Sequence, residues 1–248
     1  MIGLEDIEAA REAIGPRLHR TPTVGSATLS KLAGARVFLK AELFQKTGSF
    51  KPRGVLTNLA ALCREERARG VIGISAGNHA QALAWGAAAE GLDALLVMWQ
   101  GASEAKIEAT RGYGARVDLA SADPTEAFAR LDELVEESGR TLVHPFDHPL
   151  TMAGQGTVGM EVMEDVPDAA VVLVPVGGGG LISGTATAVK GIRPQAGESS
   201  GSIPITRARG RIPLTAVAVP EIRPPPPTGT STTAASGTSS ITSRPTVP

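Results

Sequence analysis

The amino-acid sequence predicts an α/β protein in which parallel sheets are flanked by helices. Segments with strand-like and helix-like patterns alternate along most of the chain, which is typical of parallel strands joined by helices. The strand segments, such as VIGIS and AAVVLVPVG, are almost wholly apolar, as expected of strands that are covered on both faces. The chain has 248 residues, of which 42% are hydrophobic and 20% are charged, and this is enough to bury a sizeable core.

The first half of the chain begins with apolar residues at helical spacing in LEDIEAAREAI. Pro52 stands in the first turn of the next expected helix and Gly70 closes it, which are the positions that these residues favour. In order along the chain we expect a helix at residues 4–14, a strand at 36–43, a helix at 52–70, a strand at 71–75 and a helix at 77–91.

The second half continues the alternation. Ser103 is suited to cap a helix, because its hydroxyl can accept a hydrogen bond from a first-turn N–H. Cys63, in the middle of the earlier expected helix, should pack as a small apolar residue. We expect further strands at residues 93–99, 115–120, 141–146 and 169–177, and further helices at 103–114, 124–139, 153–166 and 181–192.

The composition changes near residue 197. Half of the residues in 197–248 are Pro, Ser or Thr, and this segment has no aromatic residue, Met, Cys or Lys. A segment of this kind cannot bury enough apolar surface to offset the entropy that it loses on ordering. We therefore expect residues 197–248 to form a disordered tail, in which the apolar run at 214–219 is an edge strand at most.

The composition also narrows the classes of function. A net charge of −1 and an aromatic content of 3% disfavour nucleic-acid binding, which needs positive charge and stacking surfaces. No apolar run reaches about 18 residues, so no membrane span is expected. The single cysteine excludes an intrachain disulfide framework and favours a reducing, cytoplasmic compartment. The spacing of His, Cys and carboxylate residues predicts no metal site.

A run of glycines follows the last buried strand in VVLVPVGGGGLISG. Such a run exposes successive backbone N–H groups, and the helix that follows adds its positive end. This pattern predicts a cradle for a phosphate group, although a flexible strand-to-helix turn is the alternative. The residues of the run are Gly177, Gly178, Gly179 and Gly180.

Two other loops also lead into helices. In TGSFKPRG, Lys51 lies at the positive end of a helix, which disfavours the ammonium form and leaves an amine that can act as a nucleophile or base. A solvated surface lysine is the alternative. In ISAGNHAQ, Ser75 and Asn78 are suited to cap the helix, while free N–H groups there, with His79, could instead bind a carboxylate.

Together the three loops fit a phosphorylated carbonyl cofactor and an amino-acid carboxylate. The motifs TGSFKPRG, SAGNHAQALA, HPF, AGQGT and PVGGGGLISG stand in the order and spacing of a known family. Over roughly residues 15–196 the sequence resembles the fold-type II pyridoxal-phosphate enzymes, specifically the threonine/serine dehydratase and serine racemase group. The resemblance implies pyridoxal 5′-phosphate as cofactor, threonine or serine as a small substrate, and compatibility with a homo-oligomer.

The resemblance gives roles to individual residues. It implies that Lys51 binds the cofactor covalently and then acts as the catalytic base, while Phe50 packs against the cofactor ring. It implies that Asn78 hydrogen-bonds the phenolic oxygen of the ring, and that residues 177–180 hold the phosphate. The substrate carboxylate would bind at Ser75, Ala76, Gly77 and His79.

The implied reaction is a β-elimination. Loss of the α-proton and the β-hydroxyl from L-threonine or L-serine leads to a 2-oxo acid and ammonia. Serine racemases typically carry a serine at the position of Ala76, as a base on the opposite face of the ring, so Ala76 favours elimination over racemisation. A serine racemase, a catalytically impaired cofactor-binding remnant and an unrelated phosphate-binding module are the alternatives.

The resemblance also implies a two-domain, fold-type II architecture. Residues 1–46 and 145–196 would form the larger cofactor domain, and residues 47–144 a smaller domain that closes over the substrate. The family continues beyond this point with further strands and with a residue that contacts the pyridine nitrogen. We therefore expect an architecture truncated at the C-terminus, with residues 197–248 as a tail whose composition is compatible with a frameshift.

Overall fold

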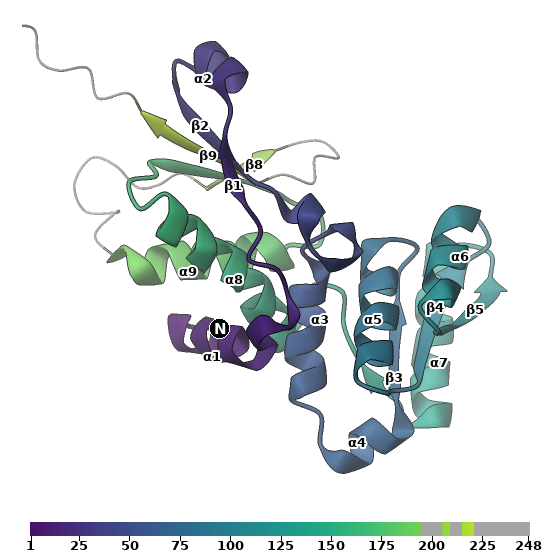
Figure 1. Ribbon diagram of the computed structural model, residues 1–248. Helices are drawn as coiled ribbons and strands as arrows, with labels where there is room; N and C mark the ends of the chain where they lie inside the picture. Colours follow the sequence, from purple (N-terminus) through teal and green to yellow (C-terminus); the bar gives the residue numbers. More distant parts are fainter. Residues whose placement is uncertain (195–204, 209–214, 221–248) are drawn as a thin grey trace, which may run out of the picture.

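The computed structural model describes residues 1–194, 205–208 and 215–220 (Figure 1). The helices in these ranges are α1 (Leu4–Ile14), α2 (Ala27–Ala33), α3 (Lys51–Ala60), α4 (Arg64–Arg69), α5 (Asn78–Ala89), α6 (Glu104–Gly112), α7 (Pro124–Ser138), α8 (Pro149–Asp165) and α9 (Gly180–Ile192). The strands are β1 (Thr23–Gly25), β2 (Ala35–Lys40), β3 (Val71–Ile74), β4 (Ala94–Trp99), β5 (Arg116–Ser121), β6 (Thr141–Leu142), β7 (Val171–Pro175), β8 (Ile205–Ala208) and β9 (Thr215–Pro220).

Four strands form a parallel sheet in the order β5-β4-β3-β6. On one face, Leu83 of α5 and Ile107 of α6 share a buried cluster with Met98 of β4. On the other face, Leu131 of α7 packs with Ile72 of β3. Both faces are thus covered by helices, as Figure 1 shows. This sheet confirms the prediction of buried parallel strands between helices.

The second sheet has five strands in the order β1-β2-β9-β7-β8. Only the β7–β8 pair is parallel among the described strands of this sheet, and the other pairs are antiparallel. Val162 of α8, Val172 of β7 and Leu181 of α9 share one buried cluster. Helix α1 packs against α8 and α9 through Ile7, so α8 and α9 lie between the sheet and α1 (Figure 1).

Strand β9 lies inside the five-stranded sheet rather than at its edge. Its backbone pairs with β2, where Val37 faces Ala218, and with β7, where Val172 faces Val217. The prediction of at most an edge strand at 214–219 is therefore wrong. Proline occurs only at the last position of TAVAVP, so the preceding residues keep the N–H groups that a central strand must donate. The expectation of disorder is also wrong at β8, whose backbone pairs with β7, and elsewhere in 197–248 it lies outside the described residues.

The single helix expected at 52–70 is two helices. Cys63 is the extended residue before α4, and its backbone N–H donates to Glu66 Oε2 at 2.8 Å. In a continuous helix this N–H would have to donate to a backbone carbonyl instead. The bond to the Glu66 side chain therefore favours a break in the helix at Cys63. Cys63 is exposed, so its expected packing inside a helix is also wrong. The strand expected at 141–146 is limited to β6, and Pro145 lacks the N–H that a longer strand would need.

Helix α3 joins the two halves of the molecule, because it packs against both α8 and α5 (Figure 1). Its approach to α8 is close. A Cβ atom added to Gly154 would lie 2.5 Å from the carbonyl oxygen of Arg53 and 2.7 Å from Cα of Gly54. Only glycine therefore fits at position 154 without moving α3. The first residue of α3 is Lys51, so this contact fixes the place of the predicted catalytic lysine.

Candidate active site

Lys51 begins α3, the helix that packs against both α8 and α5. Its Nζ donates a hydrogen bond to the carbonyl oxygen of Pro145 at 2.5 Å and lies 5.3 Å from the centre of the Phe50 ring. Burial disfavours the charged ammonium and lowers the pKa of Lys51 from 10.5 to about 8. A neutral amine is therefore accessible close to neutral pH, as a nucleophile or a base requires.

The segment at residues 143–146 connects three parts of the candidate site. The carbonyl oxygen of Val143 faces His79 at 2.9 Å, and that of Pro145 accepts from Lys51. The ring of Phe146 lies against the glycine run, because a Cβ added to Gly178 would be 2.2 Å from Phe146 Cγ. These contacts were not predicted from the sequence, where HPF contributed only to the family resemblance.

The glycine run forms the entry to α9. Gly179 is the residue before the helix and has φ of 94°, a left-handed conformation that glycine adopts without strain. Gly180 begins the helix, and a Cβ there would lie 2.6 Å from the carbonyl oxygen of Phe146. Gly177 and Gly178 are exposed. Because the first N–H groups of a helix have no partner within it, this end of α9 presents donors to an anion.

The loop between β3 and α5 contains the other predicted ligand residues. The hydroxyl of Ser75 accepts a hydrogen bond from the N–H of Gly77 at 3.0 Å. Gly77 precedes the helix without a side-chain cap, and Asn78 is exposed in the first turn. The Nζ of Lys106 would be 3.6 Å from a Cβ at Gly77, so a cation that was not predicted from the sequence lies beside this loop. The loop can therefore attract a carboxylate.

His79 faces the protein interior. The residue is 2% exposed. Because the carbonyl oxygen of Val143 can only accept a hydrogen bond, Nε2 of His79 carries the ring proton and donates to it. Burial, reinforced by the charge of Lys51, lowers the pKa of His79 to about 3. The imidazole is thus neutral with its N–H already bound. Because this N–H is occupied by Val143, the expected contact of His79 with the substrate carboxylate stays a prediction.

The residues just before Lys51 in the chain include a strained backbone position and two buried hydroxyl groups. Thr47 has φ of 60°, which is uncommon for a residue with a side chain and typical of strained functional loops. The hydroxyls of Thr47 and Ser49 are buried and lack a hydrogen-bond partner among the described residues. Unpaired buried hydroxyls are costly unless a ligand satisfies them. Together with the amine of Lys51 and the glycine run, they fit a phosphorylated aldehyde cofactor.

A buried ion cluster supports the first turn of α3. The guanidinium of Arg53 donates to Glu42 through Nε at 2.8 Å and to Glu161 through Nη1 at 2.7 Å. Lys40 is fully buried, with its Nζ 2.7 Å from Glu161. Burial opposes ionisation of Glu161, but Arg53 and Lys40 hold the pKa of its carboxyl below the usual value. This cluster was not predicted from the sequence, because it joins residues far apart in the chain.

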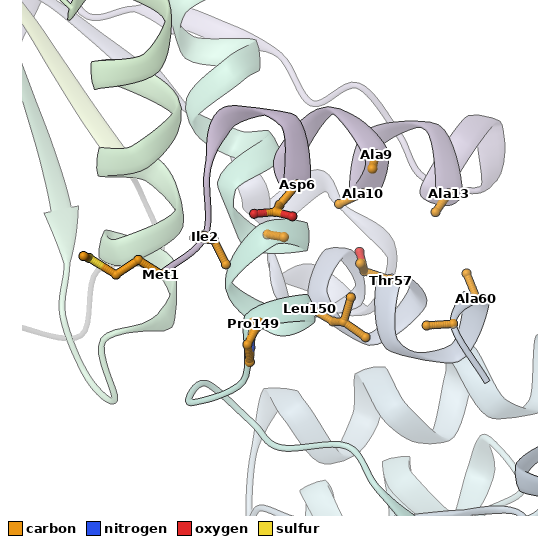
Figure 2. A pocket seen from close by; sticks show the side chains of 12 residues that line it. Met1, Ile2, Asp6, Ala9, Ala10, Ala13, Thr57, Ala60, Pro149 and Leu150 are labelled. Carbon is orange, nitrogen blue, oxygen red and sulfur yellow. The ribbon is translucent and has the colours of Figure 1, made fainter. Parts of the chain in front are cut away.

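A separate pocket of about 450 Å³ lies between α1, α3 and the start of α8 (Figure 2). Its wall is mostly apolar and includes Ile2, Ala10 and Leu150. Neither Lys51 nor the glycine run lines it. In the described ranges, no group of three or more His, Cys, Asp or Glu side chains is placed to hold a metal ion. No helix there is long and apolar enough to cross a membrane.

Curated relatives match most of this chain. L-threonine ammonia-lyase of Thermotoga maritima is 48% identical over 195 residues, which cover 79% of this chain and 49% of that protein. L-threonine dehydratase catabolic TdcB of Staphylococcus aureus is 47% identical over 195 residues, which cover 78% of this chain and 56% of that protein. The chain therefore spans about half the length of these relatives.

Solved structures share the fold. A crystal structure of the T.th. threonine deaminase superposes with a TM-score of 0.73 at 43% identity, covering 78% of this chain and 62% of that one. Serine racemase from maize gives a TM-score of 0.75 at 38% identity, covering 77% of this chain and 58% of that one. The two-sheet α/β architecture is thus that of known fold-type II enzymes.

The sequence also matches a protein family described as pyridoxal-phosphate dependent enzyme, over residues 14–242. This match begins close to the predicted start at residue 15 but continues past residue 196, so the resemblance extends further than expected. The cofactor of the family is the phosphorylated aldehyde that the geometry around Lys51 and the glycine run fits. From its sequence and its fold, the chain belongs to the pyridoxal-phosphate-dependent enzymes.

Proposed function

We propose that this chain carries the catalytic lysine of an ammonia-lyase that converts L-threonine or L-serine to a 2-oxo acid and ammonia. The observation that carries the proposal is the position of Lys51, whose amine has a lowered pKa and lies against the segment that also contacts the glycine run. The names of the relatives at 47% and 48% identity support this choice of reaction.

The cofactor would be held from both ends. Lys51 would bind its aldehyde carbon covalently, and the N–H groups at residues 177–180 would bind its phosphate. Phe50 would pack against the ring, and Asn78, exposed in the first turn of α5, would bind the phenolic oxygen. Pyridoxal phosphate supplies an electron sink that stabilises negative charge at the substrate α-carbon.

The protein residues would then bind the substrate and move its proton. The backbone N–H groups around Ala76 and Gly77, beside Lys106, would hold the substrate carboxylate at the start of α5. The amine of Lys51 would take the α-proton of the substrate. A pKa of about 8 suits a base that works near neutral pH. The methyl side chain of Ala76 offers no second base.

The domain arrangement is part of the same proposal. Residues 47–144 contain the parallel four-stranded sheet and would close over the substrate as the smaller domain. Residues 1–46 and 145–196 would form the larger domain that holds the phosphate. Lys51 lies near this boundary, which suits a residue that contacts both the cofactor and the substrate. The cytoplasm remains the expected compartment, because Cys63 is the single cysteine.

The test begins with the cofactor. Adding pyridoxal phosphate to the 248-residue chain should give the visible absorbance of a lysine-bound aldehyde, and borohydride should fix the label on Lys51 in a peptide map. Lys51→Ala should lose both signals, whereas the control Lys46→Ala should keep them. The cofactor-loaded protein, before borohydride treatment, should release a 2-oxo acid and ammonia from L-threonine or L-serine. Labelling that is unchanged in Lys51→Ala would rule the proposal out.

A further inference from the structure

We propose that the side-chain amide of Gln155 completes the anion site at the start of α9 and donates a hydrogen bond to the phosphate of the bound cofactor. The inference rests on the proposed function only for the identity of that phosphate. Gln155 lies on α8, so the phosphate site would include a side chain from a second helix in addition to the glycine run.

The first observation is that Gln155 is buried without a partner. The residue is 1% exposed, and neither Nε2 nor Oε1 has a hydrogen-bond partner among the described residues. A buried amide left in this state destabilises the fold, because the hydrogen bonds that it made to water are not replaced. Burial of this amide brings little benefit to folding, which favours a role in binding.

The second observation is where this amide lies. A Cβ added to Gly180 would be 2.7 Å from Oε1 of Gln155, so the amide is packed against the first residue of α9. Turning the amide by 180° exchanges Nε2 and Oε1, so the donor can face the same position. The N–H groups of this first turn and the amide of Gln155 would then act on one anion.

A second buried glutamine shows what a satisfied amide looks like in this protein. Gln45 is 4% exposed, and its Oε1 accepts from the backbone N–H groups of His19 at 3.0 Å and Lys46 at 2.9 Å. Its Nε2 donates to the carbonyl oxygen of His19 at 2.7 Å. Gln45 thus serves folding alone, whereas Gln155 has a similar burial and no such bonds. The contrast makes Gln45 a matched control.

The decisive experiment compares pyridoxal phosphate with pyridoxal, which lacks the phosphate. We expect Gln155→Met to lower the affinity for pyridoxal phosphate by about 10- to 100-fold, which is the range for a lost hydrogen bond to a charged group. Gln155→Glu places a carboxylate beside the phosphate and should lower this affinity further. Neither change should alter the affinity for pyridoxal, which is measured through its absorbance on Lys51. Equal losses for the two aldehydes, or no loss for either, would overturn the inference.

Two measurements without the aldehyde complete the test. Removing a buried amide that has no partner should leave the unfolding midpoint of the ligand-free protein unchanged or raised in Gln155→Met, while Gln45→Met should lower it. Inorganic phosphate should raise the midpoint of the unmodified chain and of Lys51→Ala, but not of Gln155→Glu. If the aldehyde does not bind Lys51, the proposed function fails, and the phosphate measurement still decides the role of Gln155. Equal protection of Gln155→Glu by phosphate would contradict that role.

Discussion

The ammonium of Lys51 donates to the carbonyl oxygen of Pro145 across 2.5 Å, although 94 positions separate the two residues in the chain. The same short segment accepts from His79 through Val143 and touches Gly178 through the ring of Phe146. Lys51, at the start of α3, is thereby held next to the glycine run that leads into α9. The energetic cost of burying this lysine can be measured.

Lys51 should make the folded protein less stable at neutral pH than it would be with an apolar side chain. Its pKa falls from 10.5 to about 8 on folding, so between these values the unfolded chain binds more protons, and stability should rise with pH over that range. Lys51→Met should therefore be more stable at pH 7, on the order of 1–3 kcal/mol, and lose this advantage by about pH 10.5. Urea unfolding across pH, with Lys46→Met as control, measures the difference. An advantage that is independent of pH would contradict the assignment.

His79 should make the protein sensitive to acid. Its pKa in the folded state, lowered by burial and by Lys51 to about 3, lies below the unfolded value of 6.5. The unfolded chain therefore binds the extra proton as the pH falls through this range, and stability declines by up to about 1.4 kcal/mol per pH unit. His79→Gln keeps an N–H donor for Val143 but cannot ionise, so its stability should fall less between about pH 6.5 and pH 4. His19→Gln, at an exposed position, should follow the unmodified protein.

Breaking the ion cluster at the start of α3 should be costly. Glu161→Gln removes a charge that Arg53 and the fully buried Lys40 both contact. Arg53 would then keep Glu42 and Lys40 would keep Asp165 at 3.4 Å, so the unfolding free energy should fall by up to the roughly 3–5 kcal/mol typical of a broken buried ion pair. Arg111→Gln breaks the exposed pair with Glu108 and should cost less than about 1 kcal/mol. Denaturant unfolding of both variants tests the contrast. Similar losses of unfolding free energy would show that the buried cluster stabilises the fold no more than an exposed ion pair does.

The glycine run should tolerate a methyl group at one position and reject it at the next. A Cβ at Gly178 would lie 2.2 Å from the ring of Phe146, whereas a Cβ at Gly177 would have no atom within 4 Å. Gly178→Ala should lower the unfolding midpoint and the affinity for pyridoxal phosphate, while Gly177→Ala should leave the midpoint nearly unchanged. Adding Phe146→Ala should restore part of the loss in Gly178→Ala. No rescue in this double variant would mean that the ring is not the obstacle.

Turnover of L-serine should give elimination rather than racemisation. Ala76 places only a methyl group in the loop where a second base would be needed. Chiral analysis should therefore find the 2-oxo acid well ahead of D-serine. Ala76→Ser should raise the share of D-serine, with Ala80→Ser as a control for added hydroxyl groups on α5. D-serine that forms faster than the 2-oxo acid in the unmodified chain would show that the interpretation of Ala76 is wrong.

The features that could be predicted from sequence are those that local patterns determine. Short apolar strands, Gly70 after a helix and the glycine run before α9 each depend on neighbours in the chain, and the structure has them at or near the predicted places, although β2 and β6 are shorter than expected. The family resemblance rests on motifs of the same kind, such as the one around Lys51. The roles of Phe50, Asn78 and the loop at Ser75 remain predictions that only ligand binding can test.

The features that were missed depend on contacts between distant residues. The orientation of His79 is set by Val143, and the ion cluster joins Glu42 to Glu161 through Arg53. The position of β9 depends on two open strand edges, at β2 and β7, that no local pattern reveals. The break before α4 has a shorter range, but there one side-chain contact to Cys63 outweighs helical propensity.

The order of strands in the five-stranded sheet also affects the order in which the two sheets can fold during synthesis. All four strands of the parallel sheet lie between residues 71 and 142, so a chain leaving the ribosome can complete that sheet early. In the other sheet, β2 acquires its partner on one side only when residues 215–220 have been synthesised. We therefore expect the half of the molecule that begins the chain to finish folding last, with the nascent β2 edge exposed to chaperones in the meantime.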